Sequence, residues 1–247
     1  MFEPRKLSVQ YQVERKKGES FHFRRNDQNN GESFNFNLNL DEKGLMESLS
    51  EIGPEWAEAS TDRCAGCTSN SKYCQAAVAI ASVVDAFLGL DSLETVRTRV
   101  TVGNRVTETI TPVSQVVSSL LGLCMAASGC PRTAPFRAMA VYHQPFATLE
   151  ETVIRAAGFA LLGRWAHGKL SSDDDPFAEL MDAWADLEEV NLRIGRRLQP
   201  YCTTDAALNG LVNLDMFAKG GGMGLRSALE VLKPALIDRP ETVGELY

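Results

Sequence analysis

Histidine, basic charge and long apolar runs are scarce in this chain of 247 residues. It holds three histidines, and its 25 Lys and Arg against 32 Asp and Glu give a net charge of −7. General affinity for nucleic acid needs clustered basic residues, so we expect no binding to DNA or RNA. The most apolar helical segment, Val113 to Ser128, is shorter than the roughly 18 residues of a membrane span, so we expect no membrane insertion.

Several catalytic motifs are also missing. The sequence has no G-x-S-x-G, no G-x-x-x-x-G-K-[ST], no H-E-x-x-H and no G-x-G-x-x-G after a strand. The first ten residues lack the apolar stretch of a secretory signal, so we expect a cytoplasmic protein. In that reducing compartment, grouped cysteines more often bind metal or carry redox chemistry than form disulfides. A chain of this length also buries enough surface to fold without disulfides, which leaves its six cysteines free for another role.

The first forty residues alternate apolar and polar side chains, which is the period of a half-buried strand. One run spans Leu7 to Val13, a second contains Phe21 and Phe23, and a third spans Phe34 to Leu40. Turn-forming residues separate the runs, so residues 1–40 predict a three-stranded antiparallel meander with one solvent-exposed face. The seven Lys and Arg residues of this region suit the edges and turns of a sheet.

The segment after the meander predicts one helix and a second pair of strands. Residues 61–75 hold three of the six cysteines, and residues 76–90 read as an apolar helix. Residues 95–111 are rich in β-branched side chains on both sides of Gly103-Asn104, which predicts a β-hairpin.

From residue 112 to residue 239 the apolar period is that of helices. One of them begins at a capping box from Thr148 to Glu151, and Gly220-Gly221-Gly222 is expected to break a later one. We therefore predict an α+β fold in one domain, residues 1–247. An N-terminal antiparallel sheet of about five strands, the meander plus the later hairpin, packs on a C-terminal helical bundle.

Three cysteines in residues 61–75 have the spacing of metal ligands. Cys64 and Cys67 form a Cys-x-x-Cys pair, and Cys74 stands just before the predicted helix. A Cys-x-x-Cys turn brings two sulfurs onto one ion, and the positive end of a helix dipole favours a thiolate at Cys74. Three thiolates leave one ligand position to fill.

Cys130 is our choice for the fourth ligand, because Gly129 and Pro131 place it in a tight loop and a Cys-Pro step recurs at iron–sulfur ligands. His143 is the alternative and would give a Cys₃His zinc site. The predicted cofactor is one metal centre, either a zinc ion or a [4Fe–4S] cluster.

Other interpretations of the cysteines stay open. Cys124 lies in an apolar helical stretch, where cysteine is commonly a small buried hydrophobe, and Cys202 has no supporting context. The grouped thiols could also be structurally inert, or Cys64 and Cys67 could form a redox pair, although no thioredoxin-like βαβ pattern surrounds them.

Two alternatives do not depend on the cysteines alone. Arg137, His143 and either Glu150 or Glu151 could surround a pocket for acid–base chemistry, with the metal as a Lewis acid, although Arg137 and His143 also suit purely structural roles. Alternatively, a helical face around Trp165 or Trp184 could bind a protein partner.

The same residues carry a resemblance to a known family. The three early cysteines are followed by the stretches Leu120 to Pro131 and Arg137 to Thr152, and weaker similarity continues from Asn209 to Phe217. With these motifs the chain resembles a bacterial family named domain of unknown function 6901 over most of its length. That family has no established activity, so the resemblance implies a shared fold and site but no reaction.

Overall fold

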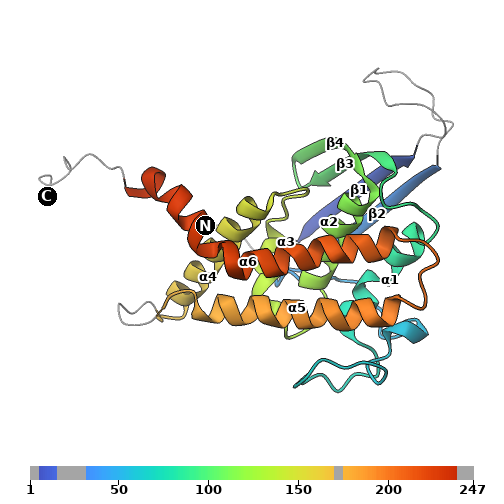
Figure 1. Ribbon diagram of the computed structural model, residues 1–247, viewed down its shortest axis with the longest axis horizontal. Helices are drawn as coiled ribbons and strands as arrows, with labels where there is room; N and C mark the ends of the chain where they lie inside the picture. Colours follow the sequence, from blue (N-terminus) through green and yellow to red (C-terminus); the bar gives the residue numbers. More distant parts are fainter. Residues whose placement is uncertain (1–5, 16–31, 170–174, 238–247) are drawn as a thin grey trace, which may run out of the picture.

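Two β-hairpins join into one antiparallel sheet in the computed structural model, which describes residues 6–15, 32–169 and 175–237. Strand β1 (Leu7–Arg15) pairs with β2 (Glu32–Leu40), and β3 (Thr95–Val102) pairs with β4 (Arg105–Pro112). Strands β1 and β3 also pair, which gives the order β2-β1-β3-β4. The sheet lies at one side of the helices (Figure 1).

The pairing of β1 corrects the predicted meander. Leu7 lies opposite Leu40 in the β1–β2 ladder, while the other edge of β1 pairs with β3, where Val9 lies opposite Val102. Both edges of β1 are therefore occupied, and no strand lies between β1 and β2. The predicted strand with Phe21 and Phe23 lies outside the described residues, so the described ranges contain four strands where we predicted about five.

One face of the sheet is buried against the helices, as the alternating pattern predicts. In β1, Tyr11 and its apolar neighbours two positions away are fully buried, whereas Gln10 and Gln12 are exposed. Helix α1 (Gln75–Phe87) covers β2, because the ring centroid of Phe87 lies 5.5 Å from that of Phe34 and 5.7 Å from that of Phe36.

Helix α2 (Val113–Ala126) is the central helix of the molecule, and 11 of its 14 residues are buried. It lies between the sheet, which it contacts through β3 and β4, and the long helix α6 (Ala206–Ile237). Helix α6 in turn packs on α4 (Leu149–Ala166) and α5 (Ala178–Leu198), and α5 and α6 run side by side in Figure 1.

The connection between α2 and α4, residues 127–148, contains two short helical segments. A 3₁₀ turn, η2 (Ala134–Phe136), leads into α3 (Arg137–Val141). Elsewhere in the chain, a second 3₁₀ turn, η1 (Glu55–Ala57), precedes the cysteine segment. The predicted capping box is confirmed: Glu151 N donates to Thr148 Oγ1 at 3.1 Å and Thr148 N donates to Glu151 Oε2 at 2.8 Å. None of the helices in the described ranges has the length and apolarity needed to cross a membrane.

Helix α6 runs unbroken through Gly220-Gly221-Gly222, where we predicted a break. A Cβ atom on Gly221 would lie 2.5 Å from Cε2 of Trp184 in α5, and one on Gly220 would lie 2.7 Å from Cδ2 of Leu149 at the start of α4. Glycine is therefore present because the backbone of α6 approaches two neighbouring helices closely. This packing offsets the low helix propensity of glycine.

Candidate metal centre and a neighbouring apolar cavity

The four cysteines predicted as ligands line one cavity of about 240 Å³. Cys64 and Cys67 lie in the loop before α1, Cys74 is the N-cap residue of α1, and Cys130 lies in the loop after α2. All four thiols are half-buried and unpaired. The thiol of Cys74 makes no capping hydrogen bond with α1, so its sulfur is not engaged by the helix end.

The Cys-x-x-Cys segment forms a tight turn. The backbone N–H of Cys67 donates to the carbonyl oxygen of Cys64 at 3.1 Å, and Gly66, between them, has a φ of 68°. A residue at this position of the turn with positive φ is most often glycine, since a Cβ atom would be strained there. The small pair Ala65-Gly66 thus permits the turn that places both cysteines at the cavity.

The loop that carries Cys130 is also fixed by local hydrogen bonds. Gly129 has a φ of 80°, and the backbone N–H of Cys130 donates to Ser128 Oγ at 3.2 Å. Burial raises the pKa of Cys130, while hydrogen bonds from the backbone N–H groups of Arg132 and Thr133 act in the opposite direction. Backbone N–H donors to a cysteine sulfur stabilise a thiolate and tune the potential of sulfur-ligated metal centres.

Charged side chains hold the cysteine turn against α5. The guanidinium of Arg132 donates to the carbonyl oxygen of Ala65 and forms an ion pair with Asp186 of α5. From the same helix, Glu189 accepts from the backbone N–H of Ala65 at 3.1 Å, and Arg193 reaches Asp62 at 2.6 Å. The sequence did not single out these residues, because each contact joins positions far apart in the chain.

Neighbouring cysteines raise the pKa of two of the thiols, Cys64 and Cys130, across the cavity. Burial and the negative charges of Cys74 and Cys130 together raise the pKa of Cys64 to about 11, and Arg132 acts against them. The thiol of Cys64 is therefore mostly protonated near neutral pH without a cation in the cavity. A bound metal ion reverses this balance, because it binds thiolates and displaces their protons.

The cysteines surround the cavity and do not meet at one point. Within residues 6–15, 32–169 and 175–237, no group of three or more His, Cys, Asp and Glu side chains has the arrangement of a metal-ion site. A zinc ion with four cysteine ligands needs all four sulfurs about 2.3 Å from one point. The arrangement is wider than a single ion requires.

The remaining candidate ligands lie elsewhere. Cys124 is fully buried in α2, where burial raises its pKa to about 12, and Cys202 does not line the cysteine cavity. His143, the alternative fourth ligand, lines a different cavity from the four cysteines.

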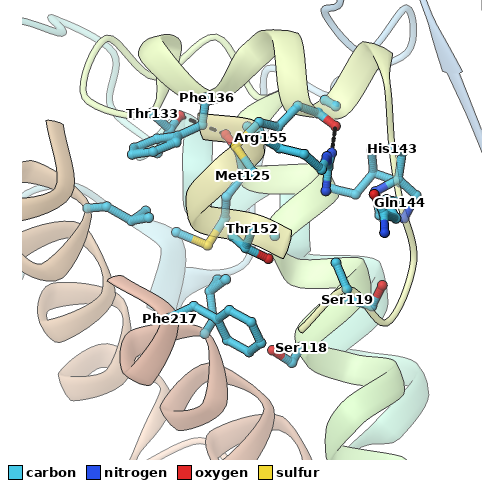
Figure 2. A pocket seen from close by; sticks show the side chains of 18 of the residues that line it. Ser118, Ser119, Met125, Thr133, Phe136, His143, Gln144, Thr152, Arg155 and Phe217 are labelled. Atoms are coloured by element: carbon cyan, nitrogen blue, oxygen red, sulfur yellow. Dashed lines mark hydrogen bonds between the residues drawn. The ribbon is translucent and has the colours of Figure 1, made fainter. Parts of the chain in front are cut away.

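That second cavity, of about 130 Å³, has mostly apolar walls contributed by α2 to α6. We call it the apolar cavity. Ser119, His143 and Gln144 lie at one side with the guanidinium of Arg155 toward them, and Phe217 lies across from them beside Ser118 (Figure 2). The two cavities share two walls, the segment 130–136 and helix α5.

His143 is held in the wall of the apolar cavity by the sheet. Its Nε2 atom lies 2.6 Å from the hydroxyl of Tyr11 in β1, and that hydroxyl lies 2.7 Å from Ser119 Oγ in α2. Burial lowers the pKa of His143 to about 3, and the nearby Arg155 and Arg105 act in the same direction. His143 is therefore a neutral imidazole at physiological pH, and the Tyr11–His143 contact joins the sheet to the α3–α4 connection.

The other residues of the acid–base interpretation are not brought to His143. Arg137, Glu150 and Glu151 do not line the apolar cavity, and the carboxylate of Glu151 is used in the capping box at the exposed start of α4. Arg137 contacts the turn at Gly44, where a Cβ atom would meet its side chain at 3.1 Å.

The predicted docking face is corrected at Trp184. This side chain is 2% exposed, and its ring lies 4.7 Å from that of Phe136, so it belongs to the core and cannot contact a partner. Trp165, on α4, is 70% exposed.

Comparison with known proteins identifies the family. Residues 20–235 match the family described as Domain of unknown function (DUF6901), and the chain belongs to that family. No curated protein and no solved structure matches the chain. The description of the family states no activity, so a function has to be inferred from the geometry above.

Proposed function

We propose that Cys64, Cys67, Cys74 and Cys130 hold one metal centre and that this centre is the functional site of the chain. The observation that carries the proposal is that all four thiols line one cavity, although Cys130 is separated from the others by α1, the β3–β4 hairpin and α2. The fixed turns at Gly66 and Gly129 support it, because each holds a cysteine in place through a positive φ and local hydrogen bonds.

The dimensions of the cavity favour an iron–sulfur cluster over a zinc ion. Four sulfurs spread around about 240 Å³ leave room for a group of several atoms, whereas a single ion would need them to collapse to one point. Arg63, Arg132 and Arg197 also line the cavity. Asp62 and Asp186 line it too, so the arginines exceed the carboxylates by one positive charge, which offsets part of the negative charge that four thiolates bring to any such centre.

A centre at this position has both a structural and a redox or sensing role in the proposal. It joins the loop before α1, the N-terminus of α1 and the loop after α2, which Arg132 already links to α5. Because the four cysteines are half-buried, small oxidants and reductants can reach the centre. Loss of the cluster would then loosen the segment 61–75, which is a change that a partner can detect.

The test measures metal content in matched cysteine variants prepared without oxygen. We expect about four iron atoms and four acid-labile sulfides per chain in the wild type and in Cys202→Ser, and a large loss in Cys130→Ser. Cys202 is the matched control, because it is also half-buried but does not line the cavity. About one zinc per chain, lost in Cys130→Ser, would support the centre and overturn the cluster. Absence of any stoichiometric metal in all three proteins would overturn the proposal.

A further inference from the structure

The apolar cavity has a cation at its polar end that no carboxylate in the described part of the chain pairs with. Arg155, on α4, donates through Nη2 to the carbonyl oxygens of Met139 at 3.2 Å and of Tyr142 at 2.9 Å. Among the described residues, Glu151 is the acid whose charge acts on the pKa of Arg155, and its carboxylate accepts from Thr148 N in the capping box. Half-buried guanidinium groups are usually paired, because an isolated charge loses solvation.

A second cation reinforces the positive charge at this end. Arg105, at the start of β4, lies close enough to Arg155 to lower its pKa, and its Nη2 atom lies 3.5 Å from the carbonyl oxygen of His143. The histidine between them is neutral and adds no compensating negative charge. The polar end of the cavity therefore attracts an anion.

The hydrogen-bonding groups of the wall point to the same chemistry. The hydroxyls of Tyr11 and Ser119 and Nε2 of His143 are used among themselves. Trp184, which also lines the cavity, is buried, and its Nε1 donor has no acceptor among the described residues. This buried donor lacks an acceptor within the ranges described, and a ligand with acceptor oxygens would complement it.

The rest of the cavity determines the size and polarity of the occupant. Its other walls are mainly apolar, with Phe136, Phe146, Leu187 and Phe217 among them. A volume of about 130 Å³ is comparable to the engineered cavity of about 150 Å³ that binds benzene. A ring or a chain of a few carbon atoms fits this space, and the polar end is open to one charged group.

We propose that the apolar cavity binds a small carboxylic acid with an apolar body, of the size of benzoate or hexanoate, and that its carboxylate pairs with Arg155. The apolar body lies among the aromatic and aliphatic side chains of the wall, and the carboxylate supplies the anionic partner that the guanidinium lacks among the described residues. This inference rests on a different cavity from the metal centre and holds whether or not the metal is present.

The test compares an acid with a neutral molecule of the same length. Calorimetric titration of the purified protein with hexanoate and with hexanol should show that hexanoate binds about 10- to 100-fold more tightly, as expected for a hydrogen-bonded charge pair. In Arg155→Gln this preference should vanish, whereas the exposed Arg226→Gln on α6 should keep it. Equal binding of the two molecules by the wild type would overturn the proposal, as would no binding at about 10 mM of either.

A second variant protects the test against misfolding of Arg155→Gln, because this side chain also supports two backbone carbonyls. Ala147 is a partly exposed residue of the cavity wall, and Ala147→Phe places a ring where the ligand body would lie. We expect Ala147→Phe to abolish hexanoate binding while the far-ultraviolet circular dichroism stays unchanged. Undiminished binding by a folded Ala147→Phe would place the acid elsewhere and overturn the assignment.

Discussion

Replacing one glycine of α6 tests the close contact between α5 and α6, which form part of the wall of the apolar cavity. In Gly221→Ala the new Cβ atom would lie 2.5 to 2.7 Å from three atoms of the Trp184 ring, about 1 Å inside normal carbon–carbon contact. Overpacking of a well-packed core costs about 1–3 kcal/mol, and the better helix propensity of alanine returns about 1 kcal/mol. We expect a net loss of up to about 2 kcal/mol in the free energy of unfolding.

Gly224→Ala, in the same helix, is the matched control. A Cβ atom there meets nothing within 4 Å, so only the propensity gain remains and the protein should become more stable by about 0.5–1 kcal/mol. Urea unfolding followed by circular dichroism measures both values, and thermal unfolding should separate the two variants by several degrees, at about 2–4 °C per kcal/mol. If both substitutions stabilise the protein equally, α6 does not approach Trp184 as described.

Two further predictions concern the buried histidine and the arginine beside the cysteine cavity. The pKa of His143 is about 3 in the folded protein, whereas its ordinary value is 6.5. As the pH falls below 6.5, the imidazole therefore takes up a proton in the unfolded chain but not in the folded one. The free energy of unfolding decreases as a result. In urea titrations, the free energy of unfolding of the wild type should fall by up to about 3 kcal/mol more than that of His143→Gln between pH 6.5 and pH 4. His167→Gln, at an exposed position, is the control and should behave like the wild type. Equal losses in the wild type and His143→Gln would contradict the burial of a neutral imidazole. Arg132→Gln removes the contacts to Ala65 and Asp186. It should weaken the retention of the metal against a chelator by about 10- to 100-fold. Retention equal to that of the wild type would refute a supporting role for Arg132.

The features that the sequence predicted well depend on residues close together in the chain. The Thr148–Glu151 capping box, the hairpin around Gly103-Asn104 and the turn at Cys64–Cys67 each use side chains or backbone groups within a few positions, and all three are present. Their signals can be read from the sequence because the physical interaction is itself local.

The features that were missed depend on distant contacts. The order of strands follows from β1 pairing with β3, which lies about 90 positions later, and no pattern within β1 encodes that choice. Gly220-Gly221-Gly222 has the composition of a helix break, but contacts with α4 and α5 decide its conformation. Propensity is a weak signal where tertiary packing opposes it.

The candidate site shows the same division. The spacing of Cys64, Cys67 and Cys74 identified three residues of the cysteine cavity, and the Gly-Cys-Pro loop identified Cys130. In contrast, the contact between Tyr11 and His143 spans 132 positions, so the sequence placed His143 at a possible pocket but did not indicate Tyr11 as its partner.

The absorption spectrum of the oxygen-free protein tests the central claim most directly. If the four cysteines hold a [4Fe–4S] cluster, the protein is brown, absorbs broadly near about 400 nm and loses this band on reduction with dithionite. Chemical analysis of the same sample should find equal amounts of iron and acid-labile sulfide. A colourless protein with all six thiols open to a thiol reagent after unfolding, and with no bound metal, would contradict the claim.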